Sequence, residues 1–123
     1  MNVKKLNHAI EVLKEDLGNA LVACDIWLTG TGQSIAGFNS NPQATALFER
    51  VTEFINKALK GAGFPGLKNY YMLELEGDNV VIVMQLKGGY QWGMLVDGKK
   101  VQLGLLLNIA LPNARRAFEE ALE

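Results

Sequence analysis

The chain has 123 residues, of which 49% are apolar and 20% are charged, and this is the composition of an ordinary globular protein. We expect one domain that spans residues 1–123. Twelve basic and thirteen acidic residues leave a net charge of −1, so no strong positive field exists to attract nucleic acid or an anionic lipid surface. Cys24 is the only cysteine, which excludes an intrachain disulfide and a cysteine-based zinc site.

The sequence shows neither a signal peptide at its start nor an apolar run long enough to span a membrane. The first ten residues contain two lysines but lack the apolar core of a signal peptide. The longest apolar stretch, Leu103–Leu111, is much shorter than the roughly 20 residues that a membrane-spanning helix needs. We therefore expect a cytoplasmic protein without a membrane span.

The first segment has the pattern of an amphipathic helix that buries one face. Its apolar residues follow each other at spacings of three and four, and they are Val3, Leu6, Ile10, Leu13 and Leu17. Gly18 follows directly, as a glycine commonly does at the C-terminal end of a helix. Ala20–Leu28 and Gln33–Phe38 then read as two strands of a hairpin with a glycine-containing turn.

The second predicted helix, about Pro42–Lys60, is more apolar than one contact requires. Asn41 has the side chain of an N-cap, and Pro42 suits the first helical position. Two apolar stripes lie next to each other on this helix: Leu47, Val51, Phe54 and Ala58 form one, and Phe48, Ile55 and Leu59 form the other. An arc of this width indicates that the helix packs against two surfaces.

Three closely spaced strands and a long helix complete the chain. Asn69–Glu76, Val80–Leu86 and Tyr90–Val96 are joined by short glycine-containing turns, which forces an antiparallel arrangement. Val80–Leu86 is apolar throughout, as expected for a central strand that is covered on both faces. The last helix, about Val101–Leu122, contains Pro112, and we expect a kink near Asn108–Leu111. The element order is α-β-β-α-β-β-β-α, an α/β (α+β) fold class.

Few residues in this sequence could carry out chemistry. His8 is the only histidine and falls on a polar face of the first helix, while Cys24 lies within an apolar strand. Asp25 is unusual because it lies in the same apolar strand, where a carboxylate needs hydrogen bonds or solvent. We predict a structural or edge role for Asp25, a buried thiol at Cys24, and no catalytic, cofactor-binding or metal site.

The element order and several segments resemble the roadblock family of dynein-light-chain-type proteins. The likeness covers nearly the whole chain. The residues that carry it are Leu13, Leu17 and Gly18 leading into Asn19–Leu28, the hairpin end Ser34-Ile35-Ala36-Gly37, the strand Val80–Leu86, and Leu103-Gly104-Leu105-Leu106-Leu107. The turn Thr29-Gly30-Thr31-Gly32 departs from the family, whose members often have Asp-Gly there, and Pro112 is a second departure.

The resemblance implies a five-stranded antiparallel sheet in the order 2-1-5-4-3, with helices one and three on one face and helix two on the other. It also implies a homodimer in which the third strands pair edge to edge and the second helices pack together. Such a dimer would use the edge of Asn69–Glu76, which would otherwise be an aggregation hazard. The expected interface residues are Leu47, Phe48, Val51, Phe54, Ile55, Tyr70, Tyr71, Met72, Leu73, Glu74 and Leu75.

The resemblance further implies a non-catalytic scaffold or regulator that binds a small Ras-like GTPase or a similar cytosolic protein. An alternative is a small-molecule-binding sensor module of PAS-like or profilin-like architecture, because a meander with flanking helices can also hold a ligand. The residues that would then line a pocket are Met72, Met84, Met94, Trp92 and Cys24. A third hypothesis is a small enzyme that uses Cys24 or Asp25.

Overall fold

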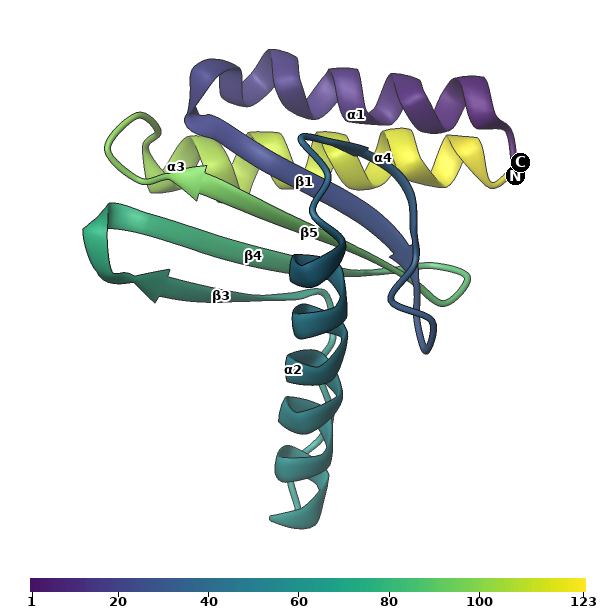
Figure 1. Cartoon of the computed structure of the whole chain (residues 1–123), viewed down its shortest axis with the longest axis vertical. Coiled ribbons are helices and arrows are strands. Elements are labelled where there is room, and N and C mark those ends of the chain that lie inside the picture. The colour runs from purple at the N-terminus through teal and green to yellow at the C-terminus, as the bar shows by residue number, and fades with distance from the viewer.

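The computed structural model describes residues 1–123, and its elements follow the predicted order (Figure 1). The long helices and the strands begin and end within a few residues of the predicted bounds. They are α1 (Val3–Leu17), β1 (Leu21–Leu28), β2 (Ser34–Phe38), α2 (Pro42–Gly61), β3 (Tyr70–Leu75), β4 (Asn79–Leu86), β5 (Tyr90–Asp97), and a last helical segment composed of α3 (Leu103–Leu105), a π-helical turn (Leu106–Ala110) and α4 (Leu111–Ala121).

The five strands form one antiparallel sheet in the order β2-β1-β5-β4-β3, which confirms the expected topology. The strands β1 and β2 are joined by a tight turn, in which Gly30 and Gly32 have φ angles of 93° and 64°. Glycine adopts such angles without steric cost. The two edges of the sheet are therefore β2 and β3.

The helices cover the two faces of the sheet to very different extents. α1 and α4 lie side by side over one face (Figure 1), where a cluster of 22 buried apolar residues forms the main core. Trp92, Ile82 and Phe118 are fully buried in that cluster. The second face, which carries α2, has a cluster of only three buried residues, Trp27, Val81 and Val83. One face is thus a complete core and the other is only partly covered.

The predicted disturbance around Pro112 takes the form of a π-helical turn. Leu106–Ala110 precedes α4, and the N–H of Leu111 donates to the carbonyl of Leu106, five residues earlier. Because proline lacks an N–H and its ring crowds the preceding turn, the helix widens there and then continues.

The two ends of the chain lie next to each other on the α1/α4 layer (Figure 1). The N–H of Asn2 donates to the carbonyl of Ala121 at 2.9 Å, and the Asn2 side chain caps the first turn of α1. None of the helices has the length and apolarity required to span a bilayer.

Candidate interaction surface

The N-terminus of α2 is held by a buried carboxylate on the sheet. Asp25, which is only 5% exposed, accepts hydrogen bonds from the Ser34 hydroxyl at 2.7 Å and from the backbone N–H of Asn41 at 3.1 Å. The Asn41 side chain in turn accepts from the N–H groups of Gln43 and Ala44, as predicted for the N-cap. Asp25 has the structural role that the sequence indicated, and it fixes where α2 begins.

A second carboxylate attaches α2 to β1 about two turns further along the helix. Glu49 accepts from the indole N–H of Trp27 at 2.7 Å and from the backbone N–H of Gly30 at 2.6 Å. The Trp27 ring lies against Gly93, where an added Cβ would come within 2.8 Å of the ring. The close approach of the Trp27 ring to β5 therefore requires a glycine at position 93.

The next contacts of α2 reach the edge strand and the loop before it. Thr52 donates its hydroxyl hydrogen to the Phe48 carbonyl at 2.7 Å, so the hydroxyl of Tyr71 donates to Thr52 at 2.8 Å. Burial raises the pKa of Tyr71 above its ordinary value, which keeps this hydroxyl protonated as the donor. One turn later, the side-chain oxygen of Asn56 accepts from the N–H of Leu67 at 2.8 Å.

The polar contacts of α2 with the sheet end at Thr52, and part of its apolar surface is exposed. Only Thr45 and Thr52 are buried among its twenty residues. Phe54 is 72% exposed, and Leu47 is exposed as well. In the view of Figure 1, the helix continues past β3, the last strand of the sheet. The wide apolar arc predicted from the sequence is therefore present, and three of the four residues in one of its two stripes, Leu47, Phe54 and Ala58, are exposed.

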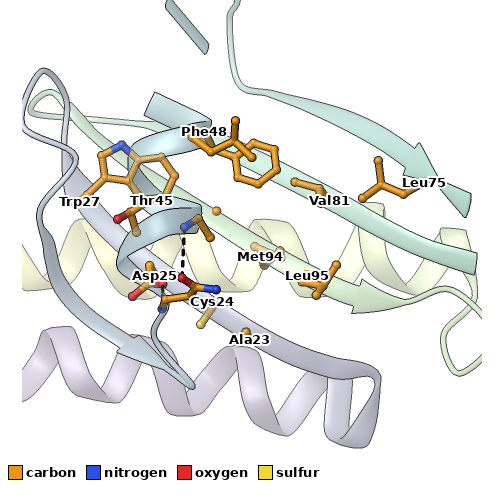
Figure 2. A pocket seen from close by; sticks show the side chains of 14 residues that line it. Ala23, Cys24, Asp25, Trp27, Thr45, Phe48, Leu75, Val81, Met94 and Leu95 are labelled. Carbon is orange, nitrogen blue, oxygen red and sulfur yellow. Dashed lines mark hydrogen bonds between the residues drawn. The ribbon is translucent and has the colours of Figure 1, made fainter. Parts of the chain in front are cut away.

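An apolar groove of about 320 Å³ lies between α2 and the sheet (Figure 2). Leu47 and Phe48 line it from α2, and Leu75 lines it from β3. Val81 and Leu95 are cross-strand neighbours that line it from the central strands β4 and β5. Polar groups of Asp25, Asn41 and Thr45 line it as well, but both Asp25 oxygens already accept hydrogen bonds.

The free edge of β3 can pair with another strand. The N–H of Gln85 donates to the carbonyl of Asn69 at 2.7 Å, so residues 69 and 85 face each other as a hydrogen-bonded pair. Because hydrogen-bonded and non-hydrogen-bonded pairs alternate in an antiparallel ladder, Met72 and Glu74 direct their backbone groups away from β4. These groups have no backbone partner within the chain.

The eleven predicted interface residues fall into two groups on the structure. Eight lie on α2 or on the α2 side of the sheet: Leu47, Phe48, Val51, Phe54, Ile55, Tyr71, Leu73 and Leu75. By strand alternation, Tyr70, Met72 and Glu74 face the α4 side, where all three are exposed. Phe54 is the most exposed residue of the first group. Val81 of β4 and Leu95 of β5, which the sequence analysis does not name as interface residues, lie on the same side of the sheet as the first group.

The residues considered for chemistry do not form a reactive site. The Cys24 side chain belongs to the α1/α4 core, and burial raises the pKa of its thiol to about 11, so it stays protonated near neutral pH. His8 is exposed on α1. No group of three His, Cys, Asp or Glu side chains is placed to hold a metal ion.

The pocket residues suggested for a sensor module are also separated. Met84 and Trp92 are fully buried in the main core, and Met72 is on the edge strand. Met94 and Cys24 border the groove, but their buried side chains belong to the main core as well.

Comparisons with known proteins show the fold. No family model and no curated protein matches the sequence. Among solved structures, Myxococcus xanthus MglB matches with a TM-score of 0.76 at 14% identity, covering 98% of this chain and 92% of that one. A structure described as MglB with a tetrameric arrangement matches with a TM-score of 0.70 at 16% identity, covering 95% of this chain and 92% of that one. A Roadblock/LC7 domain from Streptomyces avermitilis matches with a TM-score of 0.69 at 12% identity, covering 94% of this chain and 96% of that one. The chain has the roadblock fold.

Proposed function

We propose that this chain is a homodimeric scaffold or regulator that binds a small Ras-like GTPase or a similar cytosolic protein. The observation that carries this proposal is an uncovered apolar stripe on α2 together with an open strand edge at β3. Exposed apolar surface of this extent marks a site of protein association. A non-catalytic role accords with the protonated, buried thiol of Cys24.

The dimer part of the proposal rests on the chemistry of the β3 edge. A second copy of β3, related by a two-fold axis, would accept and donate the hydrogen bonds that Met72 and Glu74 direct outward. The same contact would be made twice in one isologous interface. The two copies of α2 would then meet through Leu47, Val51 and Phe54, which would remove Phe54 from water.

The GTPase part rests on the roadblock fold and on the resemblance of the sequence to a family of GTPase regulators. Among the proteins with this fold are gliding proteins of the MglB type. The dimer would place two copies of α2 on one face, and that layer would present paired surfaces to a single globular partner.

The test is a nucleotide-dependent capture from the native host. The tagged chain is incubated with lysate in the presence of GDP or a non-hydrolysable GTP analogue, and bound proteins are identified by mass spectrometry. We expect one Ras-like GTPase to be enriched in one of the two nucleotide states. If the tag alone captures as much small GTPase as the tagged chain does in both nucleotide states, the proposed GTPase partner is wrong. This result would not bear on the proposed dimer, which is tested separately.

The groove favours a second candidate function, the binding of a small apolar molecule. Its volume of about 320 Å³ lies within the range of ligand pockets. A saturable rise of the melting temperature in a ligand screen, which is lost when Leu95→Arg fills the groove, would support this candidate. Ligands that stabilise both proteins equally would argue against it.

A further inference from the structure

Asp25 is a buried carboxylate without a cationic partner, and it borders the apolar groove beside α2. We propose that this groove binds an elongated apolar molecule whose cationic nitrogen pairs with Asp25. The ligand class is therefore an alkyl amine or a related organic cation. This inference rests on the second candidate function proposed above, the binding of a small apolar molecule, and it names the chemistry of that ligand.

The charge of Asp25 is not balanced within the chain. Asp25 is the only charged side chain among the buried residues, and none of the four ion pairs includes it. Its two hydrogen bonds come from neutral donors, the Ser34 hydroxyl and the N–H of Asn41. Lys14 belongs to α1 on the other face of the sheet, where its ammonium lies 4.6 Å from the centroid of the Phe38 ring. Because buried charges in proteins are normally paired, Asp25 favours a cation from outside the chain.

The polar end of the groove offers hydrogen-bond acceptors. Each Asp25 oxygen accepts one hydrogen bond and has a second lone pair. Thr45 is also buried, and it donates its hydroxyl hydrogen to the carbonyl of Pro42 at 2.9 Å, so its oxygen can only accept from a ligand. Figure 2 shows Asp25 and Thr45 at the same end of the groove. An ammonium group has three N–H donors and no acceptor, which matches these two side chains.

The rest of the groove is apolar and elongated. Its floor contains Ala23, Leu95 and Val81, which are cross-strand neighbours on β1, β5 and β4. Leu75 of β3 lines the opposite end (Figure 2). Neighbouring strands are about 4.8 Å apart, so β1 and β3 are separated by about 14 Å. An alkyl chain that begins at Asp25 therefore has room to extend over the central strands. No lysine, arginine or histidine lines the groove, so an anionic head group would be repelled.

The expected dimer uses part of the same surface, because Leu47 and Leu75 belong both to the groove and to the predicted interface. A ligand and a second copy would therefore compete for it. The test accordingly includes the Phe54→Asp variant, which is expected to be monomeric and in which the changed residue does not line the groove.

The experiment compares three ligands of equal chain length, decylamine, decanol and decanoate, by isothermal titration calorimetry at neutral pH. They differ only in the charge of the polar end. The unmodified chain and Phe54→Asp are both titrated. We expect decylamine to bind roughly tenfold tighter than decanol, because hydrogen bonds between charged groups are stronger than those of neutral groups. We expect decanoate to bind most weakly.

The control variants change one carboxylate at a time. Asp25→Asn removes the charge and keeps the shape of the side chain, so decylamine should lose its advantage over decanol. Glu49→Gln is the matched control, because Glu49 accepts from Trp27 beside the groove but does not line it. In this variant the advantage of decylamine should remain.

Equal affinities for decylamine and decanol in both titrated proteins would overturn the inference, and so would an advantage of decylamine that persists in Asp25→Asn. The comparison of the three ligands decides the question even if Asp25→Asn does not fold. If none of the three ligands binds to either titrated protein, the second candidate function itself is wrong, so the two failures are distinguishable.

Discussion

Asp25 shows how one carboxylate can place a whole helix. It lies on β1 within an apolar strand, and its two oxygens hold the Ser34 hydroxyl and the N–H of Asn41. The residue after Asn41 begins α2, so the position of the interaction surface depends on this buried group. Its cost in desolvation is offset by hydrogen bonds to both oxygens.

Removing this carboxylate is expected to destabilise the protein. Asp25→Ala leaves the donors of Ser34 and Asn41 without partners, which costs about 2 kcal/mol of unfolding free energy. Glu11→Ala is the matched control, because Glu11 forms only an exposed pair with Lys14 and its loss should cost less than about 0.5 kcal/mol. Urea unfolding measures both. Equal stability of the two variants would contradict the anchoring role of Asp25.

At the residue scale, the burial of the Cys24 thiol can be tested by measuring the unfolding free energy as a function of pH. Burial raises the pKa of its thiol from 9.0 to about 11, so the folded state favours the protonated form. Its contribution is fully present below pH 9 and is lost as the pH rises toward 11, because the unfolded chain releases the proton first. The unfolding free energy should fall by about 1.4 kcal/mol per pH unit in this window, relative to Cys24→Ser. If the unfolding free energies of the unmodified protein and of Cys24→Ser change equally with pH, burial does not raise the pKa of the thiol.

At the element scale, a substitution of Phe54 tests most clearly whether the exposed stripe of α2 takes part in self-association. A charge at this position does not disturb the monomer, because the side chain is 72% exposed. In the proposed dimer the same charge would be desolvated, so Phe54→Asp should weaken association at least tenfold in sedimentation equilibrium.

Val3→Asp is the control for Phe54→Asp, because Val3 is 66% exposed on α1, across the sheet from α2. Its self-association should equal that of the unmodified protein. Phe48→Asp would be less informative, since Phe48 packs against Trp27 and Val81 and its loss would also unfold the monomer. If Phe54→Asp and Val3→Asp associate equally, the stripe is not part of the interface.

The edge strand β3 allows a test by proline, which removes one N–H. Met72 directs its N–H away from β4, whereas Leu73 directs its N–H toward β4. Met72→Pro should keep the fold and lose the dimer, while Leu73→Pro should lower the melting temperature as well. Circular dichroism and sedimentation distinguish the two outcomes. A dimer of normal affinity in Met72→Pro would show that the copies do not pair through β3.

Most elements of this fold could be predicted because their signals are local. The spacing of apolar residues marked α1 and α2, the glycine turns separated the strands, and Asn41 with Pro42 marked the start of α2. Pro112 signalled a distortion, but its form as a π-helical turn depends on how α4 packs on the core. The two adjacent apolar stripes on α2 indicated that this helix has more apolar surface than one contact requires.

At the scale of the whole molecule, the groove was not predictable from local patterns. Its lining joins Leu47 and Phe48 to Val81 and Leu95, and Asp25 and Glu49 attach α2 to the sheet beside these strands. The spacing of apolar residues along the chain does not predict where α2 lies on the sheet. The sheet order and the idea of a dimer came from the resemblance to roadblock proteins, and the order is confirmed by the structure. The interface residues remain a prediction.

The two faces of the sheet are covered very unequally within one chain. One face has a cluster of 22 buried residues and the other has three, although both faces of β4 are apolar. A two-fold partner would cover the second face, and the protein would then have a complete core on each side of a continuous sheet.

Sedimentation velocity of the purified chain at tens of micromolar is the most direct test of the proposed dimer. We expect a single species with twice the mass of the chain, and we expect Phe54→Asp to shift this species to the monomer. A monomer at these concentrations in the unmodified protein would overturn the proposed dimer.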